Sequence, residues 1–451
     1  MTGQAHPAPA RLDLVSLRRF AFPAALAATF AAFGLLLVWN AFHYDWLRSY
    51  DAYHSSLYVD VVHDQHRLPK ETETDVWHNP PLFFAVAGQV QAVAEAVGWP
   101  DEPRRAVQLF DVLCALGVAA FALLTARELW PRSRPAQLGT LGLAALTPVL
   151  GRAAVQYHPE PLAAVLTAGA VFVVVRAFAR ERLSWQAGLA AGALIGLANL
   201  TRTWALAAFG ALVLPLALRA VLRRERPAAL MLGALAAVTA ALTIPWFAYK
   251  WSEHGSPLAY SQPVAEQWKE NGRPSEFWFG LALDDVFTQP YQPRNINQLF
   301  PVVYSDWWGD FWRNYRMPLE LQNEPERLPD EYHDPLVLQS YAGVVPSLLM
   351  IAGVIGLAVI AVRRRSYPLL VVLGSLALLV LSFVGFIVQY PKQDGDNMKA
   401  LYLLTAAAPL SICGGWALAR VLDGSRLLAG GALLLLAAVA YLDVTFLLLP
   451  A

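Results

Sequence analysis

The apolar residues of this sequence fall in runs of about 20, and these runs constrain the fold more than any other feature. A helix of about 20 apolar residues spans the hydrocarbon core of a bilayer. The 451 residues are 57% hydrophobic and only 15% charged, well below the roughly 25% that is typical of soluble domains. The sequence therefore predicts an all-α polytopic membrane protein with about 11 transmembrane helices. The expected spans are 20–42, 104–126, 136–156, 160–178, 187–200, 203–221, 228–250, 339–361, 367–390, 400–419 and 427–449.

The distribution of charge indicates how the chain is threaded. Loops rich in Lys and Arg remain in the cytoplasm. If the N-terminus is cytoplasmic and the spans alternate, the inner segments hold 18 of the 34 basic residues but only five of the 34 acidic residues. The other segments hold 16 basic and 29 acidic residues, which is the opposite bias. We therefore expect a multi-pass protein with a cytoplasmic N-terminus, an external C-terminus and two long external segments, at 43–103 and 251–338.

Residues 81–99 resemble a further span but contain Gln89, Gln91 and Glu95. Counting them as a span would reverse every later loop and place the arginine clusters outside. We therefore expect a helix that is apolar on one face and lies at the outer membrane surface. The expected organisation is a transmembrane module with the first external loop at 1–250, a large external loop at 251–338 and C-terminal transmembrane helices at 339–451.

Several classes of function have no signature in the sequence. It contains no Walker loop, no dinucleotide fingerprint, no nucleophile elbow and no Cys/His zinc spacing. Cys114 and Cys413 each lie inside an apolar run, so we expect them to be small core residues. No cytoplasmic segment is large enough to bind a nucleotide sugar, and nothing predicts a nucleic-acid partner. These absences favour a substrate that is carried by a membrane lipid.

The first external segment reads YDAYHSSLYVDVVHDQHRLPKETETDVWHNPPLFF. Asp51 directly follows the first span and begins a stretch with helical spacing that includes Tyr53. A carboxylate there would be partly desolvated yet accessible from outside, which suits a general base or a metal ligand. Asp is also a common helix cap, so a structural role is the alternative. His78 and Asn79 precede a second helix that begins with two prolines.

The aspartate after the first span, the tyrosine-containing helix and the sequence His78-Asn79-Pro-Pro-Leu resemble the GT-C glycosyltransferases. The branch that contains the protein O-mannosyltransferases and the lipid A aminoarabinose transferases (glycosyltransferase family 39) is the most similar. The resemblance implies a GT-C fold with external juxtamembrane helices. In that family the aspartate of the first external loop is the catalytic carboxylate, here Asp51. Tyr53 and Asn79 become candidate contacts to the acceptor or the donor.

A second acidic residue lies at the external end between two spans, in QYHPEPLAAVL. Family members carry an acidic residue here, commonly Asp, where this chain has Glu160 preceded by His158. Two carboxylates from separate loops, Asp51 and Glu160, suit binding of a divalent metal ion or orientation of an acceptor hydroxyl. The exchange of Asp for Glu, with His158 as a further contact candidate, leaves metal use open, and no other cofactor is predicted.

Two basic residues are candidate ligands of a lipid phosphate. Arg202 is the lone charge in LANLTRTWAL, where family members have Thr-Lys or Thr-Arg, and a guanidinium matches a phosphate well. Lys399 and Tyr402 lie in QYPKQDGDNMKALYLL and resemble the family's late Lys/Arg-x-x-Tyr element. His78 is a third candidate. The alternative is that the two cations are simple interfacial residues that reach lipid headgroups.

The large external loop contains YSDWWGDFWR at 304–313. Trp can stack on a sugar, but it is also the standard anchor at a membrane surface. We expect these tryptophans to act as anchors or as a platform for the acceptor, and the loop to determine acceptor choice. Asp394 and Asp396 are expected to be loop carboxylates.

The sequence thus predicts a membrane glycosyltransferase, hexosyl or pentosyl, with an inverting mechanism. A sugar would pass from a polyprenyl-phosphate donor, held among membrane lipids, to an unidentified acceptor on the external face of a bacterial inner membrane. The rivals are a lipid or glycan transporter (flippase), a ligase that uses a lipid diphosphate donor, and an assembly protein without chemistry. Asp111, in the second span, is the only clear acid within an apolar run.

Overall fold

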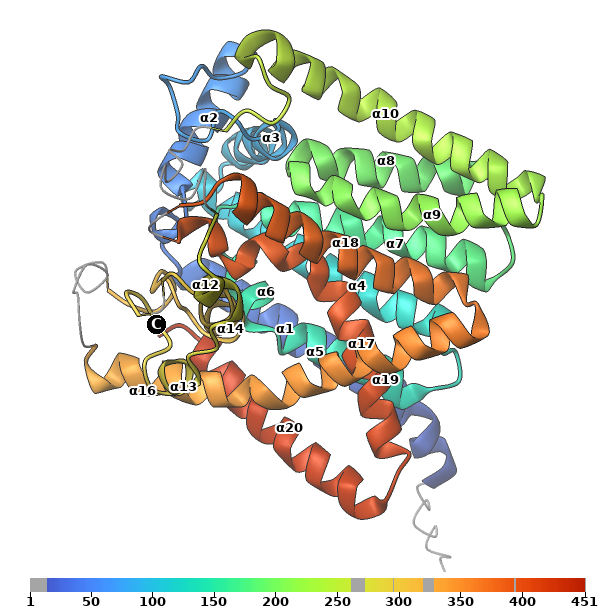
Figure 1. Cartoon of the computed structure of the whole chain (residues 1–451). Helices are drawn as coiled ribbons and strands as arrows, with labels where there is room; N and C mark the ends of the chain where they lie inside the picture. Colours follow the sequence, from blue (N-terminus) through green and yellow to red (C-terminus); the bar gives the residue numbers. More distant parts are fainter. Residues whose placement is uncertain (1–13, 261–271, 295, 319–327, 393–394, 451) are drawn as a thin grey trace, which may run out of the picture.

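A computed structural model of the chain describes residues 14–260, 272–294, 296–318, 328–392 and 395–450. These residues form helices and connecting loops, with no strand among them (Figure 1). The helices of the first part are α1 Leu14–His43, η1 Trp46–Arg48, α2 Ala52–Gln65, α3 Leu82–Ala96, α4 Pro103–Leu129, α5 Arg134–Ala145, α6 Pro148–Ala153, α7 Glu160–Ala179, α8 Trp185–Thr201, η2 Thr203–Leu206, α9 Ala207–Leu222 and α10 Arg226–His254. Those of the second part are α12 Ser275–Phe279, α13 Leu283–Thr288, α14 Leu299–Trp308, α16 Asp330–Ala342, α17 Val344–Arg364, α18 Tyr367–Gln389, η3 Asp396–Met398, η4 Ala400–Ala406, α19 Ala407–Leu422 and α20 Arg426–Leu447.

The prediction of an all-α polytopic membrane protein is confirmed. Nine helical segments within the described residues are long and apolar enough to cross a membrane. The two other expected spans are α8, with 17 residues, and the segment 136–156, which is broken into α5 and α6. The break falls at Thr147, because the residue before a proline is disfavoured in the helical region and Pro148 starts α6.

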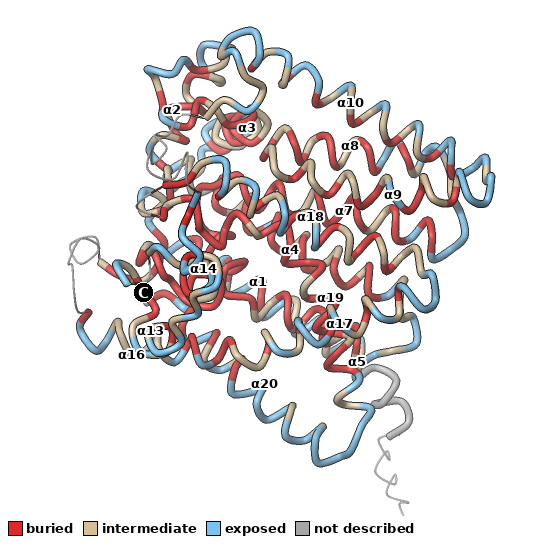
Figure 2. The backbone as a smooth tube through the Cα atoms, viewed as in Figure 1, coloured by how far each residue is buried: buried red, intermediate tan, exposed pale blue. Residues whose placement is uncertain are grey.

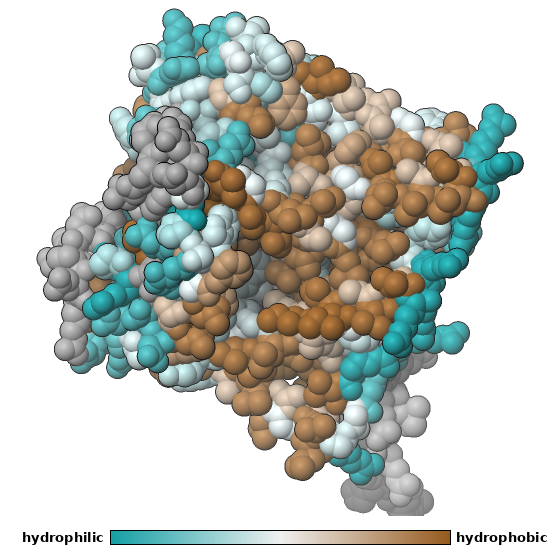
Figure 3. Space-filling view, in the orientation of Figure 1, coloured by the Kyte–Doolittle hydropathy of each residue, from teal (hydrophilic) through white to brown (hydrophobic). Residues whose placement is uncertain are grey.

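The loops gather at two opposite ends of the bundle. The arginine-rich turns after α4, α7, α9, α17 and α19 lie at one end, seen as a teal edge in Figure 3, and α2, α12, α13 and α14 lie at the other (Figure 1). The bundle's apolar, lipid-facing surface lies between them. The end of α20 lies beside the second group. Helix α3 has only 15 residues and is viewed end-on in Figure 1 while the spans run across the picture, so it does not add a crossing.

The bundle's centre is formed by η4–α19, α7 and α4. In the segment Asp396–Leu422, 83% of the most apolar window is buried within the protein, compared with 11% in α20. Figure 2 shows the same contrast between the buried centre and the exposed α20. A segment so enclosed by protein has little freedom to shift. Helix η4 is therefore held firmly in place, at the same end of the bundle as α2 and α14.

Helix α8 packs closely on α10 through glycines spaced four residues apart. A Cβ atom at Gly188 would lie 2.2 Å from the carbonyl oxygen of Met231, and one at Gly192 would lie 2.5 Å from that of Leu235. Small residues at this spacing let two membrane helices approach backbone to backbone. The contact fixes the height of α8 in the bundle, and with it the position of Arg202, the residue after its last turn.

Candidate active site

Asp51 lies between η1 and α2, at the end of the bundle where α2, α12, α13 and α14 gather. Its backbone has φ 53°, a left-handed conformation that Asp tolerates better than most residues. Asp51 occupies the cap position of α2, but its side chain makes no capping hydrogen bond. The carboxylate is only partly buried. The helix-cap alternative is therefore wrong for the side chain, and the carboxylate remains available to a substrate.

Lys399 faces Asp51 from the start of η4. Its ammonium group lies 4.4 Å from the centre of the Tyr50 ring and within electrostatic range of Asp51. It also forms an ion pair of 2.5 Å with Asp396, which pairs in turn with Lys392 at 3.1 Å. Lys399 is only 3% exposed, so it is not an interfacial lysine. The fold has brought a cation and a carboxylate together across some 350 residues of sequence.

Arg202 is the centre of a second buried cluster. Its Nε lies 2.7 Å from the Glu160 carboxylate, and one terminal nitrogen donates to the Asn79 Oδ1 at 2.6 Å. The other terminal nitrogen lies 3.4 Å from His158 Nε2. The guanidinium also stacks over the ring of Trp204, 4.9 Å from its centre. Arg202 therefore does not snorkel to lipid headgroups.

Tyr402 lies between the two clusters. It is within electrostatic range of Asp51, Arg202 and Glu160. Its ring packs against Trp204, with 5.1 Å between the ring centres. Six of the nine predicted site residues thus converge within one region: the two acids, the two cations, Asn79 and Tyr402. His158 joins them through Arg202.

His158 is held in place by its backbone. Its N–H donates to a carboxylate oxygen of Asp111 at 3.4 Å, and Asp111 is fully buried in α4. Burial, together with the nearby Arg202 and Lys399, lowers the pKa of His158 well below its ordinary value. The imidazole is therefore neutral at pH 7. Asp111, noted in the sequence only as an acid within a span, supports the turn that carries Glu160.

A cavity of about 540 Å³ adjoins the Arg202 cluster. We name it the α10–α18 cavity, because α10, η2–α9 and α18 form most of its wall. Its polar lining includes His78, Asn79 and Lys250, and the rest is mainly apolar and aromatic, such as Phe247 and Phe386. Lys250 is an unpredicted cation whose Nζ donates to the His78 carbonyl oxygen at 3.2 Å.

Two predicted site residues differ from the roles expected of them. Burial and the neighbouring Lys250 and Arg202 lower the pKa of His78 well below its ordinary value. His78 is therefore neutral at pH 7 and can offer a hydrogen bond to a phosphate, but not a charge. Tyr53 is 59% exposed on α2 and packs edge-on against His54, so the structure does not bring it into the cluster.

The described residues do not fit a metal ion held by Asp51 and Glu160. They include no group of three or more His, Cys, Asp or Glu side chains that could hold one. The guanidinium of Arg202 already neutralises Glu160, and its positive charge opposes binding of a cation there. No step below is assigned to a metal.

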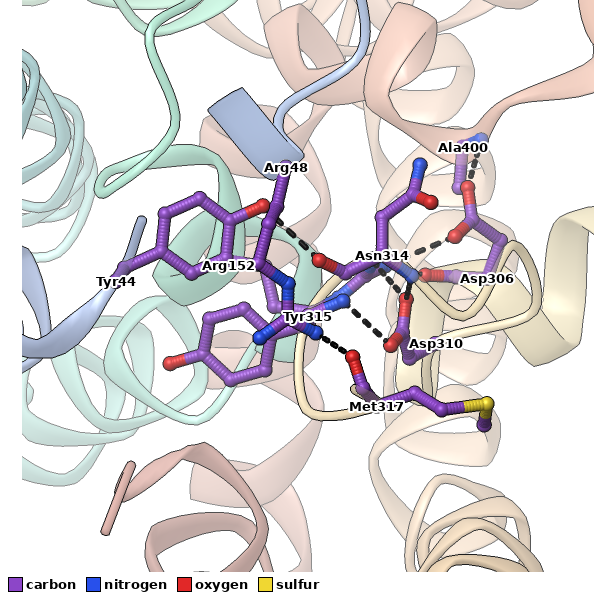
Figure 4. Close-up of polar contacts among 9 residues, drawn as sticks. All are labelled: Tyr44, Arg48, Arg152, Asp306, Asp310, Asn314, Tyr315, Met317 and Ala400. Carbon is purple, nitrogen blue, oxygen red and sulfur yellow. Dashed lines mark hydrogen bonds and ion pairs between the residues drawn. The ribbon is translucent and has the colours of Figure 1, made fainter. Parts of the chain in front are cut away.

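The segment that contains α14 is held to the bundle by a buried ionic network (Figure 4). Arg152, in α6, lies 3.0 Å from a carboxylate oxygen of Asp306 and 3.3 Å from one of Asp310. The other oxygen of Asp306 accepts a hydrogen bond of 2.7 Å from the Ala400 N–H. All three charged side chains are nearly completely buried. Because Ala400 follows Lys399, this network positions the cation that faces Asp51.

Three tryptophans of the sequence YSDWWGDFWR are buried. Trp307, Trp308 and Trp312 are at most 7% exposed, because the pairing of Asp306 and Asp310 with Arg152 turns the segment inward. The anchor interpretation is therefore wrong for these three residues, and the alternative, a platform for the acceptor, stays a prediction. Asp394 lies outside the described residues, and Asp396 is not a simple loop carboxylate, since it pairs with Lys399.

The comparisons with known proteins support a membrane protein of the GT-C glycosyltransferase superfamily. Residues 78–248 match the family of dolichyl-phosphate-mannose-protein mannosyltransferases. The predicted superfamily is therefore confirmed. No curated protein sequence matches the chain.

Solved structures share the fold. The oligosaccharyltransferase of Archaeoglobus fulgidus, in its apo form, matches over 94% of this chain and 55% of its own length, with a TM-score of 0.56 and 17% identity. The same enzyme (AglB) with an inhibitory peptide and a dolichol-phosphate matches over 95% of this chain and 56% of its own length, with a TM-score of 0.57 and 16% identity. ArnT from Cupriavidus metallidurans matches over 92% of this chain and 63% of its own length, with a TM-score of 0.49 and 18% identity. This chain thus spans about half the length of the oligosaccharyltransferase.

Proposed function

We propose that this protein transfers a sugar from a polyprenyl-phosphate donor to an acceptor hydroxyl, with inversion, on the external face of a bacterial inner membrane. One observation carries the proposal. Asp51, Lys399, Arg202 and Tyr402 converge beside a membrane-embedded cavity whose walls are largely apolar and whose polar lining includes Lys250. A lipid phosphate needs this combination of an apolar wall for its chain and cations for its charge.

Each group has a role in the reaction. The isoprenoid chain lies in the α10–α18 cavity, and the phosphate lies at its polar wall near Lys250 and Asn79, the residue that ties Arg202 to the cavity. Asp51 takes the proton of the acceptor hydroxyl, whose oxygen forms the new bond to the anomeric carbon. The bond from that carbon to the phosphate oxygen breaks, and the polyprenyl phosphate leaves with the electron pair. Lys399 and Arg202 stabilise the charge that grows on the leaving phosphate.

The dolichol-phosphate complex of AglB supports this assignment, because a protein of the same fold holds a polyprenyl phosphate. Glu160 then has a positioning role, since its carboxylate orients Arg202. His78 and His158 contribute as neutral hydrogen-bonding groups. Tyr402 packs between the cations, and Tyr53 remains a predicted contact to the acceptor or the donor on the exposed face of α2. A metal requirement stays a prediction that the site geometry does not favour.

The test is transfer of labelled sugar from a panel of polyprenyl-phosphate donors in membranes that contain the purified protein. Asp51→Asn should abolish transfer and leave donor binding unchanged, because it removes the base but keeps the shape. Asp64→Asn is the matched control, since Asp64 is a carboxylate near the other end of the same helix. Normal turnover by Asp51→Asn would refute the mechanism. Transfer from lipid diphosphate donors only would indicate the ligase, and movement of lipid without transfer would indicate the flippase.

A further inference from the structure

A second cavity, of about 460 Å³, lies on the opposite face of α18. We name it the α17–α18 cavity. It is lined by α12, α14, α17, α18, η4 and α19, whereas the α10–α18 cavity uses other residues of α18. Leu376, Val380 and Phe383 face the second cavity, and Gly385 and Phe386 face the first. The two cavities are therefore separate sites that share one helix as their wall.

The lining of the α17–α18 cavity offers almost nothing but apolar contact. None of the described residues that line it is charged. Three of its polar side chains are already hydrogen-bonded within the protein. The Trp308 Nε1 donates to the Ser347 hydroxyl, and the Tyr304 hydroxyl donates to the Ser340 carbonyl oxygen, each at 2.8 Å. A phosphate would find no partner here, so the cavity does not suit the charged end of a donor.

The cavity belongs to the membrane-facing surface. The face that Figure 3 shows is apolar over α17 and α18 and is hollowed between them. Several of the lining residues border lipid directly; Ile351 is 56% exposed and Val380 is 39% exposed. An occupant therefore comes from the bilayer and not from water.

The size of the cavity selects a hydrocarbon chain over a partner helix. A spanning helix about 10 Å wide and 30 Å long needs on the order of 2,000 Å³, several times the volume available. Aromatic side chains of the external segment also line the cavity, among them Trp278, Trp307 and Trp308. A flexible lipid chain enters from the side and fits this volume.

The inner wall connects this cavity to the reaction centre. Leu403 and Ala406 of η4 line it, and the same short helix carries Tyr402, with Lys399 directly before it. Trp307 and Trp308 line it from α14, next to Asp306, whose carboxylate binds the Ala400 N–H. A lipid with its chain in the cavity and its head at the external end would thus lie close to Asp51, across η4 from the donor.

We propose that the α17–α18 cavity holds the hydrocarbon chain of the acceptor, and that the acceptor is therefore a lipid with a hydroxyl-bearing headgroup. This inference rests on the proposed transferase function and adds the class of its second substrate. Both substrates then enter from the membrane, on either side of α18, and only their headgroups meet at Asp51.

The test uses one type of substitution at three positions on α18. Val380→Trp fills the α17–α18 cavity, and Gly385→Trp fills the α10–α18 cavity, where a Cβ meets nothing within 4 Å. Val388→Trp is the matched control, since Val388 is 60% exposed and lines neither cavity. The probes are a diacylglycerol and a polyprenyl phosphate, each with a photoreactive chain, in nanodiscs of phosphatidylcholine.

Val380→Trp should lower diacylglycerol labelling of α17 and α18 at least tenfold and leave polyprenyl-phosphate labelling within twofold of wild type. Gly385→Trp should do the reverse. In the transfer assay with membrane lipids as acceptors, Val380→Trp should abolish label in the lipid fraction. Unchanged lipid labelling by Val380→Trp, or label that enters only protein, overturns the lipid acceptor. If wild type neither binds polyprenyl phosphate nor transfers sugar, the proposed function itself fails, whatever the diacylglycerol probe shows.

Discussion

Arg152 should contribute more to the stability of this protein than any surface charge. It is 3% exposed and faces two buried carboxylates, those of Asp306 and Asp310. Arg152→Met removes the guanidinium and leaves two negative charges in a buried site. Breaking a buried ion pair from one side costs about 3–5 kcal/mol, because the remaining charge is uncompensated. We expect the free energy of unfolding to fall by this amount.

The two aspartates should respond unequally. Asp310 accepts hydrogen bonds from the backbone N–H groups of Asn314 and Tyr315, whereas Asp306 accepts one from the backbone N–H of Ala400. Asp306→Asn keeps an oxygen for Ala400 and leaves the arginine its second partner. Its cost should therefore be smaller, about 1–3 kcal/mol. The double variant with Arg152→Met should cost less than the sum, with a coupling of roughly 0.5–3 kcal/mol.

The assay is reversible unfolding in mixed micelles of detergent and sodium dodecyl sulfate, followed by tryptophan fluorescence. Arg180→Gln serves as the control, because Arg180 forms an exposed ion pair with Glu128 and exposed pairs contribute little. The reasoning is refuted if Arg152→Met is no less stable than Arg180→Gln, or if the two buried substitutions are simply additive.

Three further outcomes are expected. Lys399→Met should lower the turnover number by a factor on the order of 10², while Lys399→Arg should keep part of the activity. Equal rates for the two variants in the transfer assay would show that the cation has no role in the mechanism. Gly192→Leu should destabilise the protein by about 1–3 kcal/mol, since its Cβ would lie 2.5 Å from the Leu235 carbonyl oxygen. Gly233→Leu should be tolerated, because a Cβ there meets nothing within 4 Å. The free energies of unfolding of the two variants test this difference. His158 has a lowered pKa in the folded state, so its contribution to stability is complete above the unfolded value of about 6.5 and is lost as the pH falls below it. Replacing His158 with Gln should flatten the fall in melting temperature between pH 7 and 5, and an unchanged slope would contradict the burial argument.

The sequence predicted the spans well because apolar runs of this length are rare in proteins that do not cross a bilayer. The resemblance to the GT-C glycosyltransferases pointed to Asp51, Glu160, Arg202 and Lys399 as candidate site residues. The pairing among these residues could not be predicted. Glu160 and Arg202 are 42 positions apart, and only the packing of α7 beside α8 brings their side chains together.

Two features lay beyond sequence reasoning for different reasons. Lys250 could have been noticed as the cation at the end of the apolar run 228–250. The direction of its side chain, however, depends on the loop after α10, because its Nζ contacts the Ala259 carbonyl oxygen of that loop. The ionic network joins Arg152 to residues 154 and 158 positions away. Tryptophans beside Asp306 and Asp310 therefore looked like membrane anchors, although a distant arginine turns them inward.

The helix formed by α16 and α17 is longer than the membrane is thick. The two helices are joined through the single residue Gly343 and together cover 35 residues, from Asp330 to Arg364, which corresponds to about 52 Å at 1.5 Å per residue. The hydrocarbon core of a bilayer is about 30 Å thick, which leaves roughly 20 Å of rod standing clear of it. The helices α13 and α14 pack against the projecting part. The distance of α13 and α14 from the lipid is thus set by the projecting part of this helix, on which both rest.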